Sequence, residues 1–129
     1  MNLPQDLKYT KEHEWAKIDG TTATVGITDY AQSSLGDIVY VEMPKPGAKV
    51  EQSKQMGVVE SVKAVSDIFA PLAGTVIEIN GEVENDPAKV NNDPYGAGWL
   101  VKIQLADPGQ VKDLLDAAAY QKIVEAAAQ

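Results

Sequence analysis

The sequence predicts a mainly β fold of antiparallel strands, with a short internal helix and a helical C-terminal segment. Apolar residues alternate with polar ones at a period of two, turn residues recur at the spacing of short strands, and two stretches break the alternation. At 129 residues, with ordinary apolar and charged fractions, the chain is long enough to bury one core. We therefore predict a single domain over residues 1–129, with a β core over about residues 7–105.

Four runs of the chain alternate as half-buried strands do. They are residues 22–27, 39–43, 75–80 and 99–105. Apolar side chains form one face in three of them, namely Ala23, Val25 and Ile27, then Val39, Val41 and Met43, and finally Trp99, Val101, Ile103 and Leu105. Proline, glycine and asparagine gather between the runs, where they predict turns at residues 44–47, 71–74, 80–81 and 92–96.

Two stretches of the chain have helix signals in place of strand alternation. Thr28 is a good N-cap for a short helix over residues 29–35, and Gly36 is the residue that would end it. Near the C-terminus, the Asp-Pro pair at 107–108 is a helix start, so we predict helix over about residues 108–126. Its apolar stripe consists of Val111, Leu114, Leu115 and Ala118, after which Asp116 can cap further turns that carry Tyr120, Ile123 and Val124.

The composition excludes several classes of function. A net charge of −8 opposes binding to nucleic-acid phosphates, and no apolar run reaches membrane-spanning length. We therefore expect no nucleic-acid and no membrane partner, and a monomer that meets proteins with basic patches. Residues 1–10 carry neither a basic nor an apolar targeting pattern. We expect a cytoplasmic protein, or a mitochondrial-matrix protein if the chain is a processed eukaryotic form.

The chain is poorly equipped for catalysis by its own side chains. It has no cysteine, and its single histidine, His13, is by itself a poor metal-ligand set. We interpret His13 as a hydrogen-bonded surface or boundary residue. A triad of Ser61, His13 and Asp67 is formally possible, but no nucleophile-elbow motif surrounds a serine. Residues 96–98 lack the context of a phosphate loop, so any chemistry must come from an attached or bound group.

Lys63 interrupts an alternating segment and marks a place where such a group could be attached. Apolar and polar residues alternate over residues 58–62 and again over residues 64–68, on the two sides of the lysine. This pattern predicts a β-hairpin with Lys63 near its apex. Small neighbours on both sides leave the amine accessible. Two interpretations stay open at this point: a solvent-facing strand lysine, or a lysine that another enzyme acylates.

Residues 60–68, Glu-Ser-Val-Lys-Ala-Val-Ser-Asp-Ile, resemble the lipoyl-lysine motif of the glycine cleavage H-protein family. Further similarities to that family follow in order along nearly the whole chain, at residues 7–10, 13–15, 25–28, 31–32, 35–37, 70–71, 74, 91–95, 98–99, 114–116 and 120. Two related families fit less well. Biotin acceptors flank the lysine with methionines, and the lipoyl domains of 2-oxoacid dehydrogenases lack the His-Glu-Trp start and the helical tail.

The resemblance implies a barrel-sandwich hybrid fold of the lipoyl/biotinyl-domain kind, with lipoate bound covalently to Lys63 as N6-lipoyllysine. It implies a non-catalytic carrier that takes an aminomethyl group from glycine decarboxylase (P protein) to aminomethyltransferase (T protein). Its dithiol would then pass to dihydrolipoamide dehydrogenase (L protein). Two alternatives are a lipoyl relay or donor protein and an unmodified interaction module of the same fold.

The resemblance also implies roles for residues around Lys63. A lipoylating enzyme would recognise the lysine in its context of Glu60, Ser61, Val62, Ala64 and Asp67. In the family the loaded arm folds into a cleft, and Glu14 and Asp67 occupy positions where a carboxylate could pair with its ammonium. For both residues, turn capping or a solvated charge is the alternative. Glu12 would make this cleft more acidic or narrower.

Overall fold

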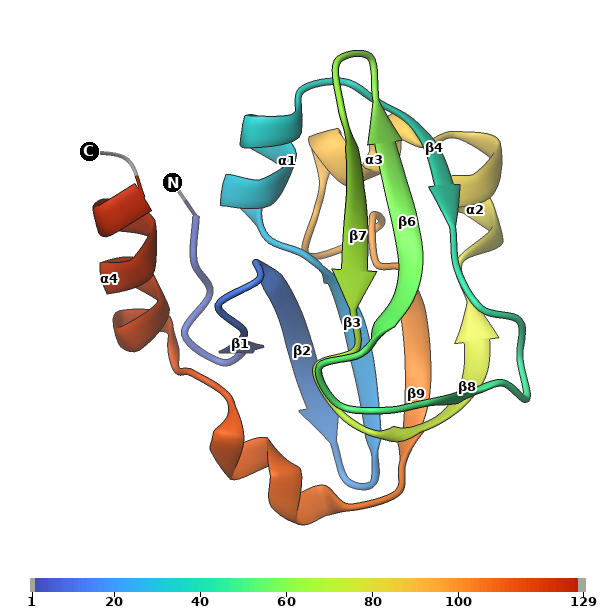
Figure 1. Ribbon diagram of the computed structural model, residues 1–129, viewed down its shortest axis with the longest axis vertical. Coiled ribbons are helices and arrows are strands. Elements are labelled where there is room, and N and C mark those ends of the chain that lie inside the picture. Colours follow the sequence, from blue (N-terminus) through green and yellow to red (C-terminus); the bar gives the residue numbers. More distant parts are fainter. Residues whose placement is uncertain (1, 128–129) are drawn as a thin grey trace.

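The computed structural model describes residues 2–127, which form a sandwich of two antiparallel sheets (Figure 1). One sheet has six strands in the order β1-β2-β3-β9-β8-β5, and the other has three in the order β4-β6-β7. This confirms the predicted mainly β, barrel-sandwich hybrid class, while the single domain over residues 1–129 stays a prediction. The strands are β1 (Lys8–Tyr9), β2 (Glu14–Asp19), β3 (Thr22–Ile27), β4 (Ile38–Glu42), β5 (Lys49–Val50), β6 (Gln55–Ser61), β7 (Val65–Phe69), β8 (Gly74–Ile79) and β9 (Val101–Leu105).

Short helices lie at the ends and the side of the sandwich. They are α1 (Asp29–Leu35), α2 (Gly81–Asn85), α3 (Ala88–Asn92), the 3-10 helix η1 (Pro108–Asp113) and α4 (Ala117–Ala127). Figure 1 shows α1 beside the end of the molecule at which β6 and β7 are joined, and α4 beside the N-terminal segment. Helices therefore border the hairpin on one side and the first strands on another.

The core lies between the sheets in two adjoining apolar clusters. Val25 and Ile103 belong to the first cluster and Val59 to the second, and all three side chains are fully buried. Met43 and Met56 pack against both clusters and so connect them. Burial of each such side chain is worth about 1.5–3 kcal/mol, which makes this interior the main source of stability.

The predicted alternation is right for β3 and wrong for β4. In β3, the predicted Ala23, Val25 and Ile27 are all buried. In β4, a bulge shifts the register between Ile38 and Tyr40, so Val41 is buried while Val39 is 53% exposed. Val41 is in the second apolar cluster and Met43 packs against it, so of the three residues predicted to share a face only Val39 points away. A bulge sets two residues opposite one, which the sequence of a single strand does not reveal.

Helix α1 is confirmed with both of its predicted ends. The Thr28 hydroxyl oxygen accepts a hydrogen bond from the backbone N–H of Ala31 at 3.2 Å. Gly36 ends the helix with a φ of 81°, a conformation that glycine adopts without strain. Local capping chemistry therefore predicted this element correctly.

The C-terminal segment is helical in part, and its first half differs from the prediction. Residues 108–113 form the 3-10 helix η1, and Leu115 then exchanges two backbone hydrogen bonds of 2.8 Å with Tyr9. Leu115 is thus extended and does not lie on a helical stripe. Asp116 accepts from the backbone N–H of Ala119 at 2.8 Å, as its predicted capping role requires. Pairing with β1, which is distant in sequence, decides this local structure.

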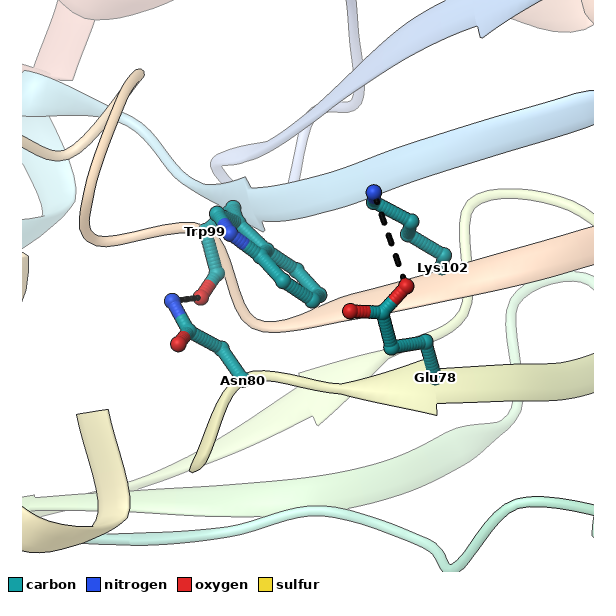
Figure 2. Close-up of polar contacts among 4 residues, drawn as sticks. All are labelled: Glu78, Asn80, Trp99 and Lys102. Carbon is teal, nitrogen blue, oxygen red and sulfur yellow. Dashed lines mark hydrogen bonds and ion pairs between the residues drawn. The ribbon is translucent and has the colours of Figure 1, made fainter. Parts of the chain in front are cut away.

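Asn80 fixes one end of the six-stranded sheet, where the sequence predicted a simple turn. Its Nδ2 donates to the carbonyl oxygens of Ala97 at 2.8 Å and Trp99 at 2.7 Å. Its Oδ1 accepts from a backbone N–H in the first turn of α2 at 3.1 Å. Figure 2 shows the contact with Trp99 beside the ion pair of Lys102 and Glu78, whose atoms lie 3.6 Å apart. The Asn-Gly pair is therefore the start of a helix that the sequence did not predict.

Helix α4 packs against the first two strands in a third apolar cluster. The members of this cluster include Leu7, Tyr9, Trp15, Ala117, Tyr120 and Val124. The rings of Tyr9 and Tyr120 are stacked, with centroids 4.8 Å apart. The C-terminal helix thereby supports the turn between β1 and β2, residues 10–13, which borders the site described next.

Candidate functional site

The hairpin of β6 and β7 presents Lys63 at its tip. The Ser61 N–H donates to the carbonyl of Ala64 at 2.8 Å, so Val62 and Lys63 are the two residues of the connecting loop. Lys63 is exposed, and Val62 beside it is 70% exposed. Figure 1 shows this loop at one end of the molecule, near α1. The structure thus contains the predicted hairpin with the lysine at its apex.

The Ser61 hydroxyl shapes this loop. Its Oγ accepts from the backbone N–H of Ala64 at 3.0 Å and from that of Lys63 at 3.3 Å. The commonest two-residue hairpin loops need a positive φ, but neither Val62 nor Lys63 has one. The serine oxygen therefore takes the place of a backbone acceptor. The Val62 N–H also donates to the carbonyl of Asp37 at 3.0 Å, which ties the loop to the segment after α1.

We expect Ser61→Ala to loosen this tip without unfolding the protein. The substitution removes two acceptor contacts, and a hydrogen bond between neutral groups is worth about 1 kcal/mol. Amide hydrogen exchange at Ala64 should therefore rise roughly fivefold or more, with only a small change in melting temperature. Ser66→Ala on β7 is the matched control. Equal exchange at Ala64 in the two variants would contradict the role given to Ser61.

The Lys63 side chain extends over the C-terminal end of α1. A Cβ atom placed on Gly36 would lie 3.6 Å from Cε of Lys63, so the glycine leaves room beside the lysine stem. Within residues 2–127, no acidic side chain lies within ion-pair distance of the Lys63 amine. The amine is therefore open to a modifying enzyme.

A small cleft with a volume of about 160 Å³ lies between α1 and β7. Its lining combines apolar and titratable side chains, among them Ile27, Leu35, Ile68, Glu12, His13 and Asp67. Leu35 precedes Gly36, so the cleft adjoins the place over which Lys63 lies. Asp67 is exposed, and its Oδ1 accepts from Nε2 of Gln55 at 3.0 Å.

A larger cleft, with a volume of about 590 Å³, lies among the β1–β2 turn, the end of β7 and the segment before α4. Its lining includes Phe69, Leu114, Ile123, Lys11, Glu12 and Glu14. Glu12 lines both clefts, which therefore adjoin at this residue. The structure thus places Glu14 in the larger cleft and Asp67 in the smaller one. A volume of several hundred Å³ is typical of a small-molecule site.

Glu14 is a buried carboxyl group, 1% exposed, in the wall of the larger cleft. Its Oε1 accepts from the Thr10 hydroxyl at 2.6 Å, and its Oε2 accepts from the Phe69 N–H at 3.2 Å. Burial raises the pKa of Glu14 to about 7, although these two hydrogen bonds act against the rise. A carboxylate has further acceptor positions, so Glu14 can also pair with a cationic ligand.

The sequence did not predict the hydrogen bonds that link His13, the residue before Glu14, to Tyr120 and Thr28. His13 has a φ of 73°, and its Nδ1 lies 2.7 Å from the hydroxyl of Tyr120. That hydroxyl lies 2.7 Å from Oγ1 of Thr28. Burial lowers the pKa of His13. His13 was predicted to be a hydrogen-bonded surface or boundary residue, and it is hydrogen-bonded and half-buried. Its partner is 107 positions away, and no local pattern indicates it.

The hydrolase alternative receives no support from the described residues. The Ser61 hydroxyl bonds the hairpin loop, Nδ1 of His13 faces Tyr120, and Asp67 bonds Gln55. Within residues 2–127, no group of three or more histidine, aspartate or glutamate side chains is placed to hold a metal ion. No helix in that part of the chain is both long and apolar enough to cross a membrane.

Known proteins share this sequence and this architecture. Residues 7–127 match the family described as glycine cleavage H-protein. The glycine cleavage system H protein of Acidobacterium capsulatum is 56% identical over 125 residues, which cover 97% of this chain and 96% of the relative. That of Myxococcus xanthus is 55% identical over 124 residues, which cover 96% of each chain. The crystal structure of a glycine cleavage system H protein from Mycobacterium marinum matches with a TM-score of 0.86 and 41% identity, over 93% of this chain and 97% of that one. The chain therefore belongs to the glycine cleavage H-protein family.

Proposed function

We propose that this chain is the lipoyl carrier of the glycine cleavage system and catalyses none of the chemical steps itself. The position of Lys63 carries the proposal, because its exposed side chain stands on a loop tied down by Ser61 and by the carbonyl of Asp37. A fixed tip loses little conformational entropy when it enters the active site of a partner. The H proteins to which the chain is similar support the same function.

The residues around Lys63 fit a lipoyl group bound through an amide. Gly36 leaves room beside the lysine stem. Leu35 and Ile68 in the small cleft, and Leu114 in the larger one, offer apolar contacts to an extended arm. When bound, the group supplies the dithiol chemistry that a chain without cysteine lacks.

The surface beside Lys63 suits recognition by a lipoylating enzyme. Val62 and Val65 are 70% and 67% exposed on the two sides of the lysine. Glu60 pairs with Val65 across the hairpin, and Asp67 follows on the same face of β7. An apolar surface with carboxylates at its margin is complementary to an enzyme with basic residues around its docking site.

The further partners that we propose are glycine decarboxylase, aminomethyltransferase and dihydrolipoamide dehydrogenase. All three would receive the arm from the same lysine, Lys63. A net charge of −8 favours partners whose docking surfaces are basic. A tethered group also has a high effective concentration at a docked partner, which suits a carrier.

Between visits to these enzymes, we propose that the loaded arm lies along α1 in the small cleft and reaches into the larger one. The small cleft adjoins Gly36 and meets the larger cleft at Glu12. Asp67 lines the first and Glu14 the second. A buried carboxylate forms strong charge-assisted hydrogen bonds, so Glu14 would keep a proton on the amine of the aminomethyl group.

Neutralising these two carboxylates should speed the spontaneous loss of the aminomethyl group. We expect Glu14→Gln to raise the rate about tenfold, since a hydrogen bond between charged groups is worth roughly 1.5 kcal/mol or more. Asp67→Asn should have a smaller effect, because Asp67 is exposed. The measurement is ammonia release from the loaded protein without partner enzymes, with Asp113→Asn in the same cleft as control. An unchanged rate in the double variant would remove both residues from the proposal.

Mass spectrometry and reconstitution test the proposed function itself. Protein produced in a host that lipoylates its own proteins should carry a lipoyl increment on Lys63. A bare lysine in lipoate-fed material would favour an unmodified interaction module. Glycine-dependent carbon dioxide exchange with glycine decarboxylase separates a carrier from a lipoyl relay, because a relay would be loaded and still give no exchange.

A further inference from the structure

We propose that Thr10 is a positioning residue for the loaded arm: its hydroxyl fixes the Glu14 carboxylate in the orientation in which the arm's ammonium pairs with it. The inference rests on the proposed function, in which Glu14 receives the ammonium. Thr10 lies in the turn between β1 and β2 and lines the larger cleft together with Glu14.

The Thr10 side chain holds Glu14 at two points. Its Oγ1 accepts from the backbone N–H of Glu14 at 3.1 Å and donates to Oε1 of the same residue at 2.6 Å. Because the backbone N–H can only donate, it occupies a lone pair of the hydroxyl oxygen and leaves the hydroxyl hydrogen for the carboxylate. The Thr10 N–H also donates to the Glu14 carbonyl at 3.0 Å. Backbone and side chain of Glu14 are therefore tied to one residue.

The other carboxylate oxygen is held from a different element. Oε2 of Glu14 accepts from the Phe69 N–H, at the end of β7, at the longer distance of 3.2 Å. Two donors on two elements define the plane of the carboxylate, whereas one donor leaves it free to rotate. Threonine suits this task, since its branched β-carbon restricts χ1 and thus the direction of the hydroxyl.

Several other titratable groups surround Glu14. Tyr9, Lys11, Glu12 and Asp113 line the same cleft, and Tyr120 of α4 is close enough to respond to the charge of Glu14. The charge of Glu12 raises the pKa of Glu14, whereas the hydrogen bond from Thr10 lowers it. All these groups remain when Thr10 is replaced. A change seen in a Thr10 variant can therefore be assigned to the hydroxyl.

The first test uses the unloaded protein and no enzyme. Carbon NMR follows the carboxyl carbon of Glu14 through a pH titration of the wild type, Thr10→Val and Thr10→Ser. We expect Thr10→Val to move the midpoint upward by about one pH unit and Thr10→Ser to restore it. Thr24→Val on β3 is the matched control and should leave it unchanged. Thr10→Ala replaces the valine variant if the added methyl group prevents folding. Equal midpoints with and without the hydroxyl would overturn the inference.

The second test uses the loaded protein and separates this inference from the proposed function. As the pH is raised, spontaneous aminomethyl loss should accelerate at a lower pH in Thr10→Val, because a Glu14 carboxyl without the Thr10 hydrogen bond keeps a proton on the amine less well. The profile should return to that of the wild type in Thr10→Ser. Faster loss in Glu14→Gln with a wild-type profile in Thr10→Val would overturn the role of Thr10 alone. Unchanged loss in Glu14→Gln would overturn the role of Glu14 and, with it, that of Thr10.

Discussion

Lys63→Arg is expected to abolish lipoyl loading and, with it, all glycine-dependent carbon dioxide exchange. A guanidinium stays protonated and does not offer the free amine that forms an amide. The fold should be unaffected, because Lys63 is exposed and its stem passes over Gly36, which has no side chain to repack. Intact-mass analysis should find no lipoyl increment, exchange should fall to background, and the melting temperature should change by no more than about 2 °C.

Lys54→Arg is the matched control for this result. Lys54 is exposed and immediately precedes β6, so it belongs to the base of the same hairpin. The control protein should be loaded to the wild-type level. A lipoyl increment on the Lys63→Arg protein, mapped to another lysine, would contradict the assignment of Lys63 as the attachment point.

The unloaded protein should lose stability as the pH rises from about 5 to about 7, and this loss should be absent from Glu14→Gln. Burial raises the pKa of Glu14 from 4.5 to about 7. Between these values the native protein holds a proton that the unfolded chain has already released, so raising the pH favours unfolding. At 1.36 kcal/mol for each pKa unit, the free energy of unfolding should fall by about 3 kcal/mol across this pH range.

The comparison of the two proteins isolates Glu14 from other groups that titrate nearby. His13 acts in the opposite direction, since burial lowers its pKa and the unfolded chain is then the state that holds the extra proton. His13 is present in both proteins, so its effect cancels in the difference. The measurement is the free energy of unfolding in denaturant at a series of pH values. Parallel pH curves for wild type and Glu14→Gln would show that burial does not perturb this carboxyl.

Elements whose determinants lie within a few residues were predictable from the sequence. Thr28 and Gly36 mark the ends of α1, because capping is a contact between neighbours in the chain. The hairpin around Lys63 was predictable for the same reason, since alternation and the lipoylation motif are both local. By contrast, the exposure of Val39 depends on a bulge against β6, and the extended backbone at Leu115 depends on pairing with β1.

The site was only partly predictable for a related reason. Glu12 and Glu14 flank His13 symmetrically in the sequence, and nothing local distinguishes the two carboxylates. The pairing of β2 with β3 sets Glu14 opposite Ile27 and buries it, whereas Glu12 precedes the strand and is exposed. The contact of His13 with Tyr120 likewise exists only after α4 has packed on the first strands.

The loop that bears Lys63 is held from two sides, by Ser61 within the hairpin and by Asp37 from the neighbouring segment. A group attached there swings about a stationary pivot. The distance that the end of the group can reach from Lys63 then depends on the length of the arm alone, because the loop itself does not bend. Under the proposed function, each enzyme that draws the arm out of the clefts would find its reactive end within the same radius of Lys63.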